Sequence, residues 1–211
     1  MNQTDDIWFR IDEESNAVDS IVQASKFITE TNNPMRWKWV IFGIDHALYM
    51  FCIIALANTD YSRVLKPIKC SNRECKEESS LDDIRNADWK CPHCGTHLTK
   101  IARENLISFD VALSRIQNEN WMHQFVTSRW KKFTSDELEM VKRLHKYLRN
   151  QIQHFVPTSS SIEIDYIKQA LNVAVNIIDF LSLQSGNVHL ENSQQEMVRE
   201  ALTIIQPLIV I

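Results

Sequence analysis

Arg149, Asn150 and His154 stand close together in the stretch LRNQIQHFVP, which covers Leu148–Pro157. Their side chains suit chemistry on a phosphodiester. An arginine presents a fixed positive fork to phosphate oxygens. The unperturbed pKa of histidine, about 6.5, lets an imidazole pass protons at cellular pH. The amide of Asn150 could position a reacting group, so these three residues are candidate catalytic residues.

The spacing of Arg149 and His154 is loose and occurs by chance in many chains, so their structural context has to decide. On a regular helix, residues five apart lie about 140° from each other. The two side chains would then border the polar face, with Asn150 between them. They could act together if the last turn before Pro157 is distorted. Alternatively, a symmetric partner chain could place a second copy of each residue opposite the first, and this is the simpler explanation.

Cys70, Cys75, Cys91 and Cys94 form a second candidate site. They follow the pattern C-x4-C, fifteen residues, then C-x2-C. Zinc prefers four ligands in a tetrahedron and binds thiolates well, and each close pair can reach one ion from a tight turn. Four cysteines fill this coordination shell, so the pattern predicts one structural zinc ion.

Some alternatives remain open for this module. His93 or His97 could replace one cysteine as a ligand, and iron could replace zinc. The segment resembles a short zinc ribbon, which could bind RNA, form a dimer interface or brace the fold. The fifth cysteine, Cys52, lies in an apolar stretch and is expected to be a small buried hydrophobic residue.

Most of the chain has the helical spacing of apolar residues that would hold these groups in place. We expect helices over residues 14–31, from Pro34 to about Asn58, and from Ser108 to about Asn118. Three capping boxes predict later helix starts at Thr134–Glu137, Ser160–Glu163 and Ser193–Glu196. The first of these helices should end before Pro157.

The predicted fold class is therefore all-α. A helical bundle of residues 1–65 and 101–211 carries a zinc-binding insertion at residues 66–100, where the helical period breaks. Only three glycines and five prolines interrupt the chain. Hydrophobic residues make up 44%, which is enough for a sizeable core and argues against global disorder.

Three polar residues fall in or beside apolar faces. The stretch Val40–Ala57 is nearly long enough to span a bilayer, but Asp45 and His46 inside it make a buried core helix the better interpretation. These two residues either line the same cleft as Arg149 or form internal hydrogen bonds. His145 is expected to be a hydrogen-bonded packing residue.

The net charge of −4 argues against a protein that coats nucleic acid or membranes by charge alone. Residues 129–149, however, contain seven Lys or Arg and three acids. Such a run is typical of a solvated helix face, but it leads directly to Arg149 and could guide RNA to it. The candidate RNA-binding residues are Arg129, Lys131, Lys132, Lys142, Arg143 and Lys146. Four tryptophans could stack on bases, although packing is the simpler role for Trp37, Trp39, Trp121 and Trp130.

The acidic, polar start MNQTDDIWFR is unlike a signal peptide. We therefore expect a cytoplasmic protein without a membrane partner. In that reducing setting the cysteines should be thiols or metal ligands.

The sequence RNQIQH, followed by SIEI at Ser161–Ile164, resembles the Arg-Asn-x3-His signature of the HEPN superfamily. Its members are small helical bundles that commonly form face-to-face dimers. Many are metal-independent ribonucleases of toxin–antitoxin, phage-defence or RNA-processing systems. The resemblance implies that Arg149 contacts the scissile phosphate, His154 acts as general acid or base, and Asn150 positions a reacting group. It also implies an RNA substrate, a homodimer, and an antitoxin or other regulatory partner. The zinc insertion departs from the general pattern.

Two other interpretations compete with a ribonuclease. Some HEPN domains have lost catalysis and bind RNA, a nucleotide or a protein partner, and the zinc insertion would then be a docking element. Alternatively, the chain is a metal-braced helical protein in which the match of Arg149 and His154 is accidental.

Overall fold

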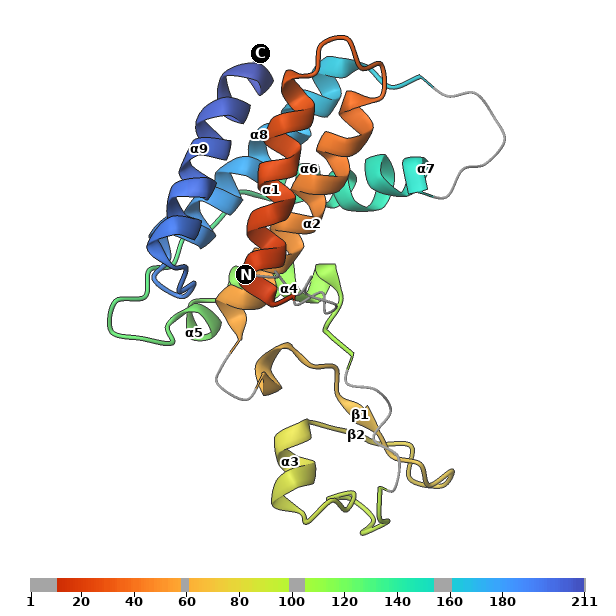
Figure 1. The fold of residues 1–211 in the computed structure, drawn as a ribbon. Coiled ribbons are helices and arrows are strands. Elements are labelled where there is room, and N and C mark those ends of the chain that lie inside the picture. Colours follow the sequence, from red (N-terminus) through yellow and green to blue (C-terminus); the bar gives the residue numbers. More distant parts are fainter. Residues whose placement is uncertain (1–10, 58–60, 99–104, 154–160, 211) are drawn as a thin grey trace, which may run out of the picture.

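The long helices of the chain pack side by side in a bundle, and a small module extends from one end of it (Figure 1). The structure is a computed structural model that describes residues 11–57, 61–98, 105–153 and 161–210. The predicted all-α fold class is confirmed. The bundle helices are α1 (Glu13–Thr29), α2 (Arg36–Leu56), α4 (Phe109–Ile116), α5 (Glu119–Met122), α6 (Ser135–Arg143), α7 (Asn150–Gln153), α8 (Ile164–Asp179) and α9 (Asn192–Ile209).

Helix α2 forms the centre of the bundle, where it packs against α1, α4 and α8. Within the described part of the chain, it is the helix long and apolar enough to cross a bilayer, and 72% of its most apolar window is buried inside the protein. A helix that is apolar on most sides belongs in a core, where other helices cover it. The interpretation of Val40–Ala57 as a core helix agrees with this arrangement.

Gly43 allows α1 and α2 to approach closely. A Cβ atom at this position would lie 2.7 Å from the backbone oxygen of Ser20 and 3.0 Å from the Cβ of Ala24. The contact with Ser20 is with rigid backbone, so the two helices would have to move apart to accommodate a side chain. Close approach here also brings Ser20 to His46, whose Nδ1 lies 2.8 Å from the Ser20 hydroxyl.

Gly43→Ala should therefore destabilise the bundle. Overpacking costs roughly 1–3 kcal/mol, whereas alanine gains at most about 1 kcal/mol over glycine in a helix. We expect a net loss of about 1–2 kcal/mol in the free energy of unfolding, measured by urea denaturation. Ser114→Ala, at an exposed position of α4, is the control and should leave stability nearly unchanged. Unchanged or increased stability of Gly43→Ala would contradict the tight α1–α2 contact.

The helix predicted from Thr134 onward is not regular. It begins as expected, with a capping box between Thr134 and Glu137. It then passes through a π-helical turn, Leu144–Arg149, before α7. A π turn adds a residue to the helical repeat, and such turns are frequent at functional sites. Angles taken from a straight helix therefore do not hold across this segment.

Two predicted helix starts are wrong by a few residues. Helix α8 begins at Ile164 with Glu163 as N-cap, so Glu163 is not the third helical residue that the box from Ser160 requires. Helix α9 begins at Asn192, and the backbone N–H of Glu191 donates to the side chain of Gln194 over 3.0 Å. Glutamate replaces the expected serine as N-cap in both cases. At α9 a capping box still forms, but between Glu191 and Gln194, two residues before the expected one.

The small module contains β1 (Ile68–Lys69), β2 (Glu78–Ser79) and α3 (Leu81–Asn86). The two strands pair antiparallel, with Ile68 opposite Ser79. Its side chains form a hydrophobic cluster separate from that of the bundle, and this cluster comprises Cys70, Ile84, Cys91 and Leu98, with Ile68 and Cys75 packed against it. Four residues cannot supply much burial energy, so a metal would be the natural stabiliser of so small a unit.

The module joins the bundle through the strand-like pairing of Leu65 with Leu106. Beside this junction, the guanidinium groups of Arg63 and Arg115 lie 4.8 and 4.2 Å from the ring of Trp121. The sequence left open whether Trp121 stacks on bases or packs. It packs against these two arginines and the core of the bundle.

Candidate functional site

The four cysteine sulfurs of the small module converge on one point. All four Sγ atoms lie within 4.8 Å of one another. The Sγ atoms of Cys70 and Cys94 are 3.7 Å apart, and those of Cys75 and Cys91 are 3.8 Å apart. A tetrahedron with metal–sulfur bonds of about 2.3 Å has sulfur–sulfur edges of about 3.8 Å. The four cysteines therefore have the geometry of a metal centre, as the sequence predicts.

Hydrogen bonds favour the thiolate form at part of this cluster, whereas burial and the neighbouring thiols raise the pKa of Cys70 and raise that of Cys75 to about 12. The N–H of Asn72 donates to Cys70 Sγ over 3.4 Å. The side chain and backbone of Thr96 hold the pKa of the Cys94 thiol down to about 6. Gly95 has a φ of +70°, which lets the chain turn tightly after Cys94. Hydrogen bonds to sulfur stabilise the charged form that a metal requires.

The alternative ligands and the fifth cysteine are also accounted for. Within the described residues, the metal-binding cluster consists of the four cysteines and includes neither His93 nor His97. Cys52 is fully buried in α2, and burial raises the pKa of its thiol, which makes it an unreactive core residue as expected.

A cleft of about 530 Å³ opens on the side of the bundle. Its volume lies within the range of ordinary ligand sites, roughly 300–1,000 Å³. Helices α2 and α4 and the π-helical turn contribute its lining residues, which are Phe42, Asp45, His46, Tyr49, Ser108, Phe109, His145 and Arg149. The cleft thus joins residues from sequence regions about a hundred positions apart.

Asp45 and His145 form a close pair in this cleft. The Nδ1 atom of His145 lies 2.9 Å and 3.2 Å from the two carboxylate oxygens of Asp45, which is buried. An ionised carboxylate only accepts hydrogen bonds, so Nδ1 must carry the proton. In the neutral imidazole the Nε2 atom is then the hydrogen-bond acceptor. Phe109 stacks on the imidazole at a centroid distance of 4.1 Å and fixes the plane of the ring.

Arg149 ends the π-helical turn and lies beside the same carboxylate. Its Nε atom is 3.8 Å from Oδ2 of Asp45, and its Nη1 donates to the Asn150 side-chain oxygen over 3.2 Å. About a third of the arginine side chain, 32%, is exposed. Asp45 and Asn150 therefore orient the guanidinium while part of it stays available to an anion.

His46 is the second histidine that lines the cleft. Its Nδ1 lies 2.8 Å from the hydroxyl of Ser20 on α1. Partial burial lowers the pKa of His46, and Arg149 acts in the same direction, whereas Asp45 opposes them. His46 is therefore expected to be neutral at pH 7 and to act as a hydrogen-bonding group rather than a cation.

The structure describes two of the three predicted catalytic residues. Arg149 and Asn150 contact each other at the cleft, whereas His154 lies outside the described residues. Asp45 and His46 line the same cleft as Arg149, which was one of the two interpretations left open by the sequence. The sequence predicted only part of the role of His145. It is hydrogen-bonded and stacked, as expected of a packing residue, yet it also faces the cleft.

The six candidate RNA-binding residues do not line the cleft. Lys146 Nζ pairs with Asp110 over 2.7 Å, and Arg143 Nε pairs with Glu139 over 3.1 Å. Arg129 lies in the loop before α6, where its backbone N–H donates to the backbone oxygen of Ser185, just after the π-helical turn Phe180–Gln184 that follows α8. Two of the six charges thus already have acidic partners. Their role in RNA binding stays a prediction.

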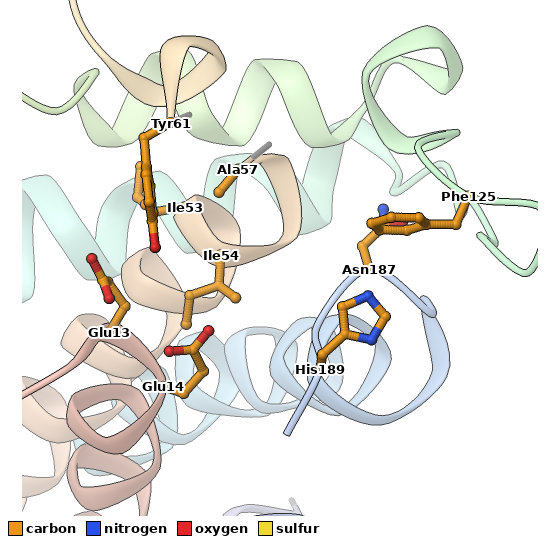
Figure 2. A pocket seen from close by; sticks show the side chains of 9 residues that line it. All are labelled: Glu13, Glu14, Ile53, Ile54, Ala57, Tyr61, Phe125, Asn187 and His189. Atoms are coloured by element: carbon orange, nitrogen blue, oxygen red, sulfur yellow. The ribbon is translucent and has the colours of Figure 1, made fainter. Parts of the chain in front are cut away.

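A second hollow, of about 200 Å³, lies near the start of α1 (Figure 2). Glu13 and Glu14 lie at one side of it, and Phe125 and His189 lie at the other. Two carboxylates repel a phosphate, so this hollow does not suit a nucleic acid. The larger cleft, with Arg149 and two histidines, is the candidate functional site.

The chain matches no protein-family model, no curated protein and no solved structure.

Proposed function

We propose that the chain is a HEPN-like, metal-independent endoribonuclease whose active site is the cleft around Arg149. One observation carries this proposal: an arginine and a carboxylate-held histidine, both partly exposed, meet in one cleft of suitable size. These are the groups that phosphodiester cleavage needs, because negative charge must be stabilised and protons must be moved.

In the proposed reaction, the ribose 2′-oxygen attacks the adjacent phosphorus and the bond to the 5′-oxygen of the next nucleotide breaks. The Nε2 atom of His145 accepts the 2′-OH proton, and Asp45 stabilises the imidazolium that forms. His154 donates a proton to the leaving 5′-oxygen. Arg149 binds the phosphate oxygens on which charge develops, and Asn150 keeps Arg149 in position. The products are a 2′,3′-cyclic phosphate and a 5′-hydroxyl, and DNA is not cut because it lacks the 2′-OH.

The metal centre has a structural role in this proposal. Zinc is the ion that suits four thiolates in a tetrahedron, and four protein ligands leave it no open position for a substrate. The proton transfers and charge stabilisation described above come from side chains of the bundle alone. A cytoplasmic, reducing setting keeps the thiols free to bind the ion.

Dimerisation and a restraining partner follow from the same proposal. A symmetric dimer would place the clefts of the two chains face to face. A ribonuclease with broad activity would need an antitoxin or another regulatory protein, and a toxin or phage-defence system is the setting that the HEPN resemblance suggests.

The direct test compares the wild-type protein with His154→Ala on a pool of cellular RNA. We expect cleavage by the wild type and a loss of two to four orders of magnitude in the variant, the usual contribution of a general acid or base. His123→Ala, at an exposed histidine outside the cleft that is paired with Glu119, is the control and should keep full activity. Unchanged cleavage by His154→Ala would end this assignment of the acid.

Asp45→Asn should lower cleavage while the fold persists. The amide is nearly isosteric with the carboxylate but carries no charge, so it no longer stabilises an imidazolium at His145. We expect roughly a 10²–10⁴-fold lower kcat with a nearly unchanged circular dichroism spectrum. Asp110→Asn, which removes the charge paired with Lys146 outside the cleft, is the matched control. Full activity of Asp45→Asn would exclude Asp45 as the group that stabilises an imidazolium at His145.

The second candidate function is RNA binding without cleavage. The aromatic walls of the cleft, Phe42, Tyr49 and Phe109, favour it because they suit a stacked base as well as a reacting one. Tight RNA binding by a wild-type chain that does not cleave would favour this function.

A further inference from the structure

A line of aromatic side chains runs along α2 from the cleft to the first turn of the helix. Trp39, Phe42, His46 and Tyr49 are spaced three or four residues apart, so they share one face of the helix. The last three line the cleft. Trp39 lies beyond it and is 43% exposed, although tryptophan is usually well covered.

Ring contacts connect Trp39 to the cleft and fix its position. The centroids of Trp39 and Phe42 are 6.2 Å apart with the rings tilted by 45°. Phe27 of α1 stacks on Trp39 at 5.7 Å, with an angle of 23° between the rings. Phe27 and Phe42 thus hold the Trp39 ring in place, although much of its surface is exposed to solvent. Because the ring is already fixed, a ligand that stacks on it costs less conformational entropy.

Positive charge accompanies the aromatic line. Lys38 places its ammonium group 4.7 Å from the Trp39 ring, whereas the guanidinium of Arg36 lies over Trp37 instead. The first turn of α2 contains no acidic residue. The Lys38 side chain is long and flexible, so a base could take its place on the ring while the ammonium moves to a neighbouring phosphate. Interleaved basic and aromatic groups are typical of single-strand binding surfaces.

We propose that this face of α2 is a binding path for single-stranded RNA, in which a base stacks on Trp39 and Lys38 contacts the backbone. The proposal rests on the proposed function, since it takes the cleft around Arg149 as the site of cleavage. Trp39 and Asp45 are six residues apart, or about 9 Å along the helix. This distance corresponds to two to three stacked bases at about 3.4 Å each. The path therefore holds the strand a few nucleotides from the scissile phosphate.

This assignment differs from the approach surface expected from the sequence. The basic run at residues 129–146 offers charge, but none of its six candidate residues lines the cleft. The path along α2 combines charge, exposed aromatic surface and continuity with the cleft. It predicts binding to unpaired RNA with little preference for base identity, because every base can stack.

The test measures binding of a fluorescent 2′-O-methyl RNA decamer of mixed sequence by anisotropy. This probe cannot be cut by a 2′-OH mechanism, so the wild-type chain can be used. We expect Trp39→Ala to weaken binding about 5- to 150-fold, the effect of losing one stacked base. Trp39→Phe should retain most of the affinity. Lys38→Gln should reduce the slope of log K against log salt concentration by about 0.7.

Phe125→Ala is the matched control, because Phe125 is an exposed aromatic residue at 49% on the wall of the other hollow. It should bind the decamer like the wild type. Equal affinity of the wild type and Trp39→Ala would overturn the path. A change of oligomeric mass in Trp39→Ala, seen by light scattering without a change in affinity, would overturn it in favour of a protein interface.

Cleavage of unmodified RNA by the same proteins separates this inference from the proposed function. If the wild type cuts RNA but Trp39→Ala binds the decamer normally, the path is wrong and the ribonuclease stands. If Trp39→Ala loses binding but the wild type never cuts RNA, the path stands and the ribonuclease is wrong.

Discussion

Arg149→Ala should lower the rate of RNA cleavage by two to three orders of magnitude. The guanidinium is the one charged group of the described cleft that can bind a phosphate and stabilise the charge that develops on it. Loss of one such preorganised donor typically costs 10²–10³ in kcat. The measurement is single-turnover cleavage of a labelled RNA, which reports the chemical step separately from product release.

Two further variants make this result specific. Arg149→Lys keeps the charge but loses the planar fork, so its activity should lie between those of the wild type and the alanine variant. Arg199→Ala removes an exposed arginine of α9, where it pairs with Glu196 outside the cleft, and should cut RNA normally. Wild-type rates for Arg149→Ala would rule out the proposed charge stabilisation.

Arg149→Ala also removes a positive neighbour of a buried carboxylate. Asp45 keeps His145 as a partner at 2.9 Å, so the fold should survive. The melting temperature should therefore change far less than the activity. A large loss of stability in this variant would make its kinetic effect uninformative, and Arg149→Lys would then carry the test.

Removal of the metal should unfold the small module and leave the bundle folded. Structural zinc in small domains contributes an apparent free energy of about 10–16 kcal/mol, and the described core of the module contains few other buried groups. Cys91→Ala deletes one ligand and should lower the zinc content to well under one ion per chain. Amide hydrogen exchange should then show loss of protection in residues 66–98 and continued protection in α2 and α8.

Cys52→Ala is the natural control for this experiment. It removes the one cysteine outside the cluster, so the zinc content should stay at one ion per chain. If Cys91→Ala still retained a full equivalent of zinc, the four-thiolate site would be incorrect. If iron copurified in place of zinc, the site would stand but the metal would change.

Local patterns predicted the helices and the clustering of the four cysteines well. Two kinds of short-range pattern were sufficient: the spacing of apolar residues in α1 and α2, and the C-x4-C and C-x2-C pairs. Neither pattern depends on contacts with distant parts of the chain. The buried Asp45 also gave a signal, since a charged residue inside an apolar helix needs a polar partner. The sequence could not name that partner, because His145 lies 100 residues away and only the packing of the bundle brings the two together.

Non-local geometry explains the remaining differences. The π-helical turn at Leu144–Arg149 follows no clear residue pattern, yet it alters which residues face the cleft. The start of α8 at Glu163 has no side-chain cap, and the box of α9 uses Glu191 and Gln194, so the serine-based capping pattern misplaces both starts. The exposure of Trp39 also depends on tertiary structure, because its position in the helix would be equally compatible with a buried side chain.

The chemistry of the product ends distinguishes attack by the ribose 2′-OH from other routes of RNA cleavage. Purified, zinc-loaded protein is incubated briefly with single-stranded RNA in EDTA, and the new termini are identified by mass spectrometry. We expect 2′,3′-cyclic phosphate and 5′-hydroxyl ends, with no cleavage of the 2′-O-methyl analogue. Products with 5′-phosphate ends, cleavage that stops in EDTA while the protein stays folded, or no cleavage by the folded protein would each contradict the proposed function.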